Sequence, residues 1–307
     1  MKILVTGGGG FVGRHLVREL ETQGDEVWVG TIECEKEDRH VQFFLDDENW
    51  MDRVLEKGKF DVIYHLAGQP SVHISFEKPF EVFVVNTIGA LNLIKLVAER
   101  YKQTKLVVAG TSEVYKLKNE ALTEDCDFDP KSPYAMSKLV VDYFIRKMSN
   151  KLELNCTLMR PFSNIGPGQH ENFALSSFAK QIAEIKLGKR EKKIRVGNLN
   201  VYRDFIDVRD AVKAYSLVKN ENEKGEVYDI CSGILYKLSD CLDKLIQISG
   251  VEGIKIEVDQ NRLRTNDVEY CLGSYEKINK KFGWKPEIKI EKTLTDLFNY
   301  WYEKLSS

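Results

Sequence analysis

Short apolar runs alternate with amphipathic segments along the first half of the chain. The runs are rich in valine, isoleucine and leucine and end in glycine, threonine or proline, which is typical of strands buried on both faces. Between them, apolar residues recur at helical spacing. We predict strands at 2–6, 26–31, 41–45, 60–68, 105–111 and 152–161, and helices at 11–24, at 79–101 and from Ser132 onward.

This alternation predicts a doubly wound α/β fold, in which a parallel Rossmann sheet is covered by helices on both faces. Beyond about residue 162 the pattern is less regular, and short strands and helices follow a cluster of glycine and proline. We therefore predict a Rossmann domain at 1–165 and a smaller C-terminal α/β lobe at 166–307 that interleaves with it. Ligands of such sheets bind beyond the carboxyl ends of the strands.

The composition narrows the classes of function. Apolar residues make up 43% of the 307 residues, and the net charge is -2 with both signs mixed along the chain. This balance argues against nucleic acid or an anionic membrane as a partner.

The first residues are typical of a strand and a glycine loop rather than a secretory signal. The six cysteines form no CxxC pair, and the five histidines lack metal-ligand spacing. We expect a cytoplasmic protein with reduced thiols and no metal.

The stretch TGGGGFVG joins the first predicted strand to the first predicted helix. Gly7 permits the tight turn, Gly10 allows a pyrophosphate to approach the main chain, and Gly13 allows the helix to pack closely on the strand. The helix N-terminus, which begins with Phe11 and Val12, offers amides and a partial positive charge to phosphate. In this context the loop predicts a dinucleotide site rather than a purely structural turn.

The end of the second strand predicts which dinucleotide is bound. Glu33 lies 20 residues after Gly13, where a carboxylate accepts hydrogen bonds from a free ribose 2′-hydroxyl and repels a 2′-phosphate. This favours NAD(H) over NADP(H). Two alternatives stay open: Glu33 could be a solvated residue of the charged stretch ECEKED, and Arg14 could neutralise a 2′-phosphate. Asp46, after the third strand, is either an acceptor for the adenine amino group or a surface acid.

Tyr134 and Lys138 lie four residues apart, on one face of the helix that begins near Ser132. They follow a buried strand, at the end of which Thr111 should line the ligand cleft. A lysine ammonium and a positive nicotinamide ring would lower the tyrosine pKa and let Tyr134 exchange a proton with a substrate oxygen, which Thr111 would hold. Alone, the pair would be ordinary helix surface. Together with the glycine loop, it predicts a catalytic group.

Several motifs together resemble the extended short-chain dehydrogenases/reductases, the epimerase/dehydratase family that modifies nucleotide-activated sugars. They are TGGGGFVG, YHLAG (64–68), GTSEVY (110–115), YAMSK (134–138), RPFSNIGPGQ (160–169), RDFIDVRDAVKAY (203–215), VYDICSG (227–233) and GWKP (283–286). The resemblance implies that Leu66, Ala67 and Gly68 line the cofactor site and that Lys138 holds the nicotinamide ribose.

Within the family, the second half of the chain is most similar to reductases of GDP-linked 4-keto-6-deoxy sugars. This similarity implies hydride transfer from NAD(P)H to C4 of the keto sugar, with Tyr134 as the proton donor and Thr111 orienting the carbonyl. Glu113 leaves an alternative open, since in the family's 4,6-dehydratases a glutamate in such a Thr-Ser-Glu stretch removes the C5 proton. A second alternative is a non-catalytic dinucleotide-binding sensor, although such proteins often lose the tyrosine or the lysine.

The resemblance also implies contacts to the nucleotide sugar. The candidates are Asn164, Lys180, Arg203 and Arg264. The two arginines match positions that contact the diphosphate or ribose, and guanidinium suits phosphate by geometry. Without the resemblance, Asn164 would be read as a turn asparagine, and the lysine and the two arginines as solvated surface residues. Two positions depart from the family pattern, because Lys116 stands where glycine is usual and Glu33 where some similar reductases have an arginine suited to NADP.

Two further expectations concern packing. The family usually pairs through the long helix at 79–101 and the tyrosine helix, which implies a homodimer, but burial against the sheet would explain the apolar stretch 139–145 equally well. His65 lies inside an apolar run, and we predict a hydrogen-bonded core residue there rather than a base.

Overall fold

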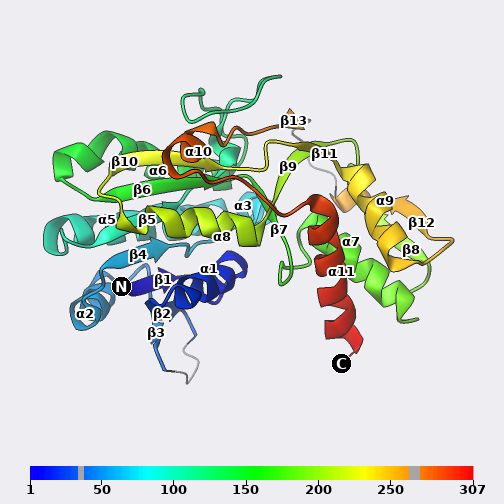
Figure 1. Cartoon of the computed structure of the whole chain (residues 1–307), viewed down its shortest axis with the longest axis horizontal. Helices are drawn as coiled ribbons and strands as arrows, with labels where there is room; N and C mark the ends of the chain where they lie inside the picture. Colours follow the sequence, from blue (N-terminus) through cyan, green and yellow to red (C-terminus); the bar gives the residue numbers. More distant parts are fainter. Residues whose placement is uncertain (34–37, 263–269, 307) are drawn as a thin grey trace.

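The computed structural model describes residues 1–33, 38–262 and 270–306. Figure 1 shows a large sheet with its helices next to a smaller lobe that contains the C-terminal helix. Arg264, one of the predicted substrate residues, lies outside the described residues.

A seven-stranded sheet of parallel strands forms the larger part, as the alternating pattern predicts. Its order is β3 (His40–Gln42), β2 (Glu26–Thr31), β1 (Lys2–Thr6), β4 (Val62–His65), β5 (Lys105–Ala109), β6 (Cys156–Pro161) and β10 (Lys224–Ile230). The direction of strand order changes between β1 and β4, and ligands of doubly wound sheets bind at the carboxyl ends there. The second half of the chain returns to supply β10, so the division between 1–165 and 166–307 stays a prediction.

Helices cover both faces of this sheet. On one face lie α1 (Phe11–Thr22), α8 (Val208–Leu217) with the turn η3 (Val218–Asn220), and α10 (Glu276–Phe282). On the other lie α2 (Glu48–Gly58), α5 (Gly89–Arg100) and α6 (Pro133–Leu152), which follows the short turn η2 (Ser112–Val114). Leu16 and Tyr215 are buried in the first layer, and Leu93 and Ile145 in the second. The predicted strand at 152–161 begins later, at Cys156, because α6 continues to Leu152.

The predicted helix at 79–101 is one helical run with an interruption. It consists of α4 (Pro79–Phe83), a π turn η1 (Val84–Ile88) and α5, and it is preceded by α3 (Val72–Glu77). Among the described residues this run is long and apolar enough to cross a membrane by length and composition, but half of its apolar window is buried inside the fold. Core helices pass the same test, so the run is weak support for a membrane span.

The smaller lobe has its own core. Its strands are β7 (Ser163–Ile165), β9 (Tyr202–Asp207), β11 (Leu235–Lys237) and β13 (Tyr270–Cys271), with β8 (Lys193–Val196) paired to β12 (Lys255–Val258). Its helices are α7 (Ala174–Lys186), α9 (Leu238–Ser249), the turn η4 (Gln260–Arg262) and α11 (Ile290–Ser306). Phe178, Leu242 and Leu297 are among the residues buried between these elements.

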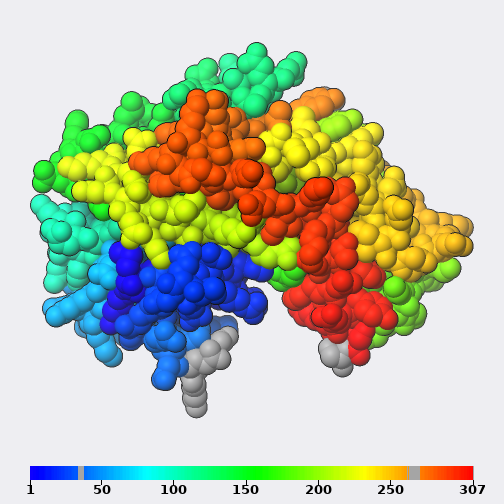
Figure 2. All heavy atoms as spheres, viewed as in Figure 1, coloured from blue at the N-terminus to red at the C-terminus, as the bar shows by residue number. Residues whose placement is uncertain are grey.

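The two parts are joined at several points and separated by a recess at one edge. His15 on α1 hydrogen-bonds through Nε2 to the main-chain oxygen of Pro167, at 2.9 Å, in the loop that follows β7. Figure 2 shows the recess between the N-terminal segment, in blue, and α11, in red.

Candidate active site

The turn between β1 and α1 depends on two of its glycines. Gly7 has a positive φ of 71°, which glycine adopts without strain. A Cβ on Gly13 would overlap the main-chain oxygen of Gly7 and approach the Cα of Gly8 to 2.7 Å. The helix therefore packs on the turn at a distance that a larger residue would prevent, as expected of a dinucleotide loop.

The N-terminus of α1 is open to an anion. Gly10 is the N-cap residue, and no side chain caps this helix. The first helical amides belong to Phe11 and Val12, which are partly buried against the core of the sheet. Uncapped amides at a helix N-terminus are donors for phosphate, so these residues fit the diphosphate of a dinucleotide.

The loop after β4 lies against the glycine turn. The amides of Leu66 and Ala67 donate to the main-chain oxygen and Oγ1 of Thr6, at 3.1 and 3.4 Å. A Cβ on Gly68 would lie 2.7 Å from the Oδ1 of Asn86 and 3.8 Å from the Nζ of Lys138. The predicted cofactor residues of the two loops thus meet at the carboxyl ends of β1 and β4.

Glu33 and Asp46 follow the neighbouring strands β2 and β3, whose last residues, Thr31 and Gln42, are paired in register. Both carboxyl side chains are exposed. The hydroxyl of Thr31 donates to the main-chain oxygen of Glu33, which fixes the chain just past β2. The two acids thus lie beyond the strand ends that border the glycine turn, where the adenosine half of a dinucleotide would lie.

Thr111 and Tyr134 come from different elements and meet beyond the carboxyl end of β5. Thr111 caps η2, and its Oγ1 accepts a hydrogen bond of 3.3 Å from the amide of Glu113. Its side chain also hydrogen-bonds the Tyr134 phenol. Ser132 caps the first turn of α6 and thereby fixes where the tyrosine helix begins.

The pKa values of the tyrosine and the lysine differ from the sequence expectation. Burial raises the pKa of Tyr134 to about 12; the Glu113 carboxylate acts in the same direction, and the hydrogen bond with Thr111 opposes it. Burial lowers the pKa of Lys138 to about 8. The expected lowering of the tyrosine pKa is therefore wrong for the chain by itself. The Nζ of Lys138 donates to the main-chain oxygen of Ala109, at 3.0 Å, and burial of the phenol dominates.

Glu113 belongs to the same site. Its side chain is exposed, and its charge contributes to raising the pKa of Tyr134 and of Cys271. The fold thus gathers Thr111, Glu113, Tyr134 and Lys138 at one place. Their assignment as catalytic residues stays a prediction.

Asn86 is a residue of this region that the sequence reading missed. It lies in the π turn η1, is almost fully buried, and bonds the main chain of Gln69 through both side-chain atoms, at 2.8 and 3.1 Å. Its Nδ2 also donates to the Oγ of Ser137, next to Lys138 on α6. The available signal was a lone amide inside the apolar stretch VVNTIGA, since π turns are frequent at functional sites.

The predicted substrate residues do not form one cluster. Asn164 lies on β7, and its Oδ1 is buried without a hydrogen-bond partner among the described residues, as expected of a group that waits for a ligand. Lys180 on α7 is paired with Glu171 and Glu184 and lies over the ring of Trp301. That engagement is typical of a structural lysine, whereas the unpartnered side-chain oxygen of Asn164 favours binding.

Arg203 lies beside the catalytic turn, on β9. Its register partner on β13 is Cys271, whose thiol interacts with Ser112 and Glu113 of that turn and with the Arg203 charge. Asp204 holds this arrangement, because its buried carboxylate accepts from the amides of residues 232, 233 and 273. Cys271 was also missed, since nothing in the sequence pairs it with residues 112–113.

His65 is a core residue, as predicted. His65 is buried, its Nδ1 lies 2.9 Å from the Oγ1 of Thr6, and burial lowers its pKa to about 3. The five cysteines in the described part of the chain are free. Across residues 1–33, 38–262 and 270–306, no three His, Cys, Asp or Glu side chains are grouped as metal ligands.

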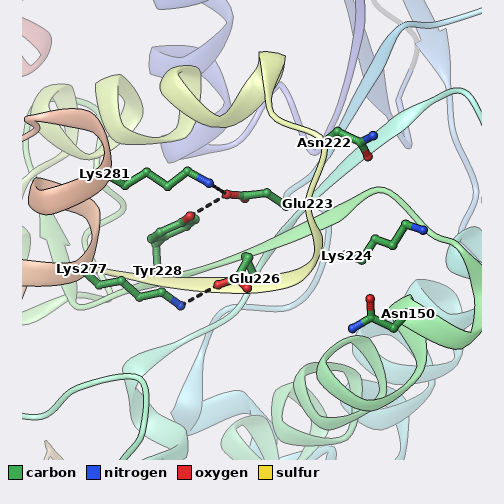
Figure 3. A pocket seen from close by; sticks show the side chains of 8 residues that line it. All are labelled: Asn150, Asn222, Glu223, Lys224, Glu226, Tyr228, Lys277 and Lys281. Atoms are coloured by element: carbon green, nitrogen blue, oxygen red, sulfur yellow. Dashed lines mark hydrogen bonds and ion pairs between the residues drawn. The ribbon is translucent and has the colours of Figure 1, made fainter.

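A cavity of about 500 Å³ opens beside the start of β10, which is an edge strand of the sheet. Figure 3 shows Lys281 directed at Glu223 and Lys277 at Glu226, with Lys224 and Asn150 on the other side. Its charges are therefore largely paired with each other. The candidate active site lies at the carboxyl ends of the strands, away from this cavity.

Comparison with known proteins agrees with this geometry. A family model described as GDP-mannose 4,6 dehydratase matches residues 4–297. The chain is 31% identical to GDP-6-deoxy-D-mannose reductase of Pseudomonas aeruginosa, over 99% of this chain and 98% of the relative. It is 30% identical to GDP-6-deoxy-D-talose 4-dehydrogenase of Aggregatibacter actinomycetemcomitans, over 92% of each chain.

The fold also matches solved structures. RMD from Pseudomonas aeruginosa, solved in complex with NADPH, superposes with a TM-score of 0.88 at 29% identity, and the match covers 99% of this chain and all of that one. The match includes both the Rossmann sheet and the smaller lobe. The chain therefore belongs to the GDP-mannose 4,6-dehydratase family of extended short-chain dehydrogenases/reductases, which are nicotinamide-dependent enzymes of nucleotide-sugar metabolism.

Proposed function

We propose that this enzyme reduces the C4 ketone of a GDP-linked 4-keto-6-deoxy sugar. The observation that carries the proposal is the Tyr134 phenol, which hydrogen-bonds Thr111 and, with a pKa of about 12, keeps its proton at neutral pH. Reduction of a ketone requires a protonated donor at the carbonyl oxygen, and a phenol that keeps its proton at neutral pH meets this requirement.

The chain's own residues have separate tasks in this reaction. Thr111 and Tyr134 hold the carbonyl oxygen between two hydroxyl groups, and Tyr134 gives its proton to that oxygen as the alcohol forms. Lys138 stabilises the resulting phenolate by its charge. The bound nicotinamide supplies the hydride, and the glycine turn and the open N-terminus of α1 fit its diphosphate.

The substrate class is supported by residues and by relatives. The unpartnered Oδ1 of Asn164 on β7 and the cation of Arg203 on the paired strand β9 would hold hydroxyl groups and the diphosphate. Two relatives that each cover at least 92% of this chain are named for GDP-6-deoxy sugars. We therefore place GDP ahead of other nucleotides.

We further propose a preference for NADH over NADPH. The support is Glu33, whose exposed carboxylate follows β2 and would repel a 2′-phosphate. The similar RMD structure is a complex with NADPH, so this preference would distinguish the two proteins.

We also propose a cytoplasmic homodimer. One surface of the helical run at 79–100 and of the neighbouring α6 exposes seven large apolar side chains, which are Phe80, Val84, Val85, Ile88, Met136, Val140 and Tyr143. Phe80 is 85% exposed. Contiguous apolar surfaces of this kind on a monomer are typical of protein interfaces.

A dehydratase is the second candidate, and Glu113 favours it. The carboxylate lies beside Tyr134, where it would remove the C5 proton of a 4-keto sugar and cause loss of water from C6. A non-catalytic sensor is a weaker candidate, because Thr111, Tyr134 and Lys138 are all present and gathered at one place.

A paired incubation with product masses tests these candidates. One tube holds GDP-4-keto-6-deoxy-mannose with stoichiometric NADH or NADPH, and the other holds GDP-mannose with catalytic NAD or NADP. Oxidation of the cofactor with a gain of two hydrogens in the first tube is the expected result. Loss of water in the second tube, without net change of cofactor, would replace the reductase with a dehydratase. Cofactor binding without turnover of either sugar nucleotide would favour the sensor.

A further inference from the structure

Arg160 lies at the carboxyl end of β6 and has no exposed surface. Its guanidinium donates to both carboxylate oxygens of Asp142, at 2.6 and 2.8 Å, and to the hydroxyl of Tyr115, at 2.6 Å. That hydroxyl lies 2.7 and 2.8 Å from the two carboxylate oxygens of Asp229. The Oε1 of Glu124 accepts from the amide of Asp229, at 2.9 Å. These five residues form the Arg160 cluster.

The cluster joins the two halves of the candidate catalytic site. Asp142 lies on α6, four residues beyond Lys138 and eight beyond Tyr134, so the three side chains share one face of the helix. Tyr115 directly follows η2, four residues beyond Thr111. One guanidinium therefore bonds the helix that carries Tyr134 and the turn that carries Thr111.

Stability alone does not explain such a cluster. Replacing a buried ion pair with well-packed apolar residues is often neutral or stabilising, because burying the charges is costly. Fully bonded polar networks in a core do fix geometry, since each group has one set of partners. The Tyr134–Thr111 hydrogen bond depends on such fixed geometry, because its two partners come from separate segments.

We propose that Arg160, Tyr115 and Asp142 are positioning residues, which hold Thr111 at hydrogen-bonding distance from Tyr134. They act through the turn and the helix, and the reacting atoms contact Thr111 and Tyr134 instead. This inference rests on the proposed function, because it assigns a role within the same site.

The chain offers a matched pair of variants. Tyr115→Phe removes a buried hydroxyl that bonds a carboxylate of β10. Tyr228→Phe removes a buried hydroxyl on β10 itself, which donates to the Oε1 of Glu223, just before the strand, at 2.6 Å. Tyr228 lines the cavity at the start of β10 (Figure 3). Each variant loses a buried hydroxyl that bonds a carboxyl group, but the Tyr115 hydroxyl also accepts from Arg160 and so belongs to the Arg160 cluster.

The first readout is steady-state kinetics, at a temperature where both variants are folded. Tyr115→Phe is expected to lower kcat about tenfold with little change in the KM for the sugar, because misplaced groups slow the chemical step. Tyr228→Phe is expected to keep kcat within about twofold of the parent. Equal kcat values for the two variants would overturn the inference.

The second readout needs no sugar. Hydrogen exchange of the amides at 110–115 and 134–138 is expected to accelerate in Tyr115→Phe and to stay unchanged in Tyr228→Phe. Equal exchange of these segments in both variants would also overturn the inference. A parent enzyme that fails to reduce the keto sugar would refute the proposed function instead, and the exchange comparison would still decide the role of the cluster.

Discussion

The Nζ of Lys138 donates a hydrogen bond of 3.0 Å to the main-chain oxygen of Ala109, the last residue of β5. The lysine is buried, and burial lowers its pKa to about 8, whereas the Tyr134 pKa is about 12. Of the two residues, Lys138 is therefore the one that titrates close to neutral pH.

We predict that kcat/KM for the reduced cofactor falls as the pH rises through about 8. Above this pH Lys138 loses its proton, and a neutral amine no longer stabilises the phenolate that forms on Tyr134. The check is a pH–rate profile of the parent and of Lys138→Arg, in which the guanidinium stays charged. The fall should move to higher pH in the variant, and an unmoved fall would assign it to another group.

Glu33 is predicted to set the cofactor preference. Replacement by glutamine removes a negative charge that would face the 2′-phosphate of NADPH, and one such exposed repulsion is worth about 1 kcal/mol. Glu33→Gln should therefore raise kcat/KM for NADPH relative to NADH roughly fivefold. Glu99→Gln changes an exposed glutamate at the end of α5 and is the control. Equal ratios in both variants would exclude Glu33 from the ribose site.

Alanine substitutions at two glycines of the first loop should have different effects on stability and on cofactor binding. A Cβ at Gly13 would overlap the Gly7 oxygen, so Gly13→Ala should lower the free energy of unfolding by about 2 kcal/mol and weaken cofactor binding. A Cβ at Gly10 would meet one oxygen at 3.1 Å, so Gly10→Ala should stay folded but bind NADH at least about tenfold more weakly. Urea unfolding and cofactor titration measure the two effects. Normal cofactor affinity in Gly10→Ala would show that the diphosphate does not approach this turn.

The proposed dimer interface can be tested by placing a charged residue in it. Val84 on η1 and Val140 on α6 are 50% and 42% exposed, and a glutamate at either place would be buried in the interface at a cost of several kcal/mol. Light scattering should therefore report a monomer for Val84→Glu and for Val140→Glu. Ile256→Glu, at a similarly exposed position on β12, should leave the dimer intact. Two dimeric variants would show that this surface is not the interface.

The sequence was most informative where local pattern and local chemistry coincide. The strands β1, β2 and β5 begin where their apolar runs begin, and the glycine turn has the close packing that its spacing predicts. Tyr134 and Lys138 lie on one helix face because helical spacing fixes that relation. Each of these features depends on residues that are neighbours in the sequence.

Features that depend on contacts between distant segments could not be predicted from the sequence. β10 joins the first sheet from the second half of the chain, and β13 brings Cys271 to the catalytic turn through pairing with β9. The raised pKa of Tyr134 depends on burial, which periodicity does not measure. The same is true of Asn86, whose role follows from contacts with Gln69 and Ser137 across the fold.

The balance between one buried arginine and several buried acids in the Arg160 cluster leads to a further prediction. One guanidinium faces the carboxyl groups of Asp142 and Asp229, with Glu124 alongside. Asp142 bonds Arg160 through both oxygens, as a carboxylate does. Burial, and secondarily the charge of Glu124, raise the pKa of Asp229 well above its ordinary range, so a charge on Asp229 is less favourable than on an ordinary aspartate.

An amide at position 229 keeps the shape of the side chain and removes a charge that burial disfavours, so Asp229→Asn should lower the free energy of unfolding by less than about 1 kcal/mol. Asp142→Asn leaves the buried guanidinium without its counter-ion and should cost about 3 kcal/mol. Urea unfolding at neutral pH measures both losses. Because the two substitutions are chemically identical, equal losses would mean that the charge of Asp229 is balanced as well as that of Asp142, against the direction of its pKa shift.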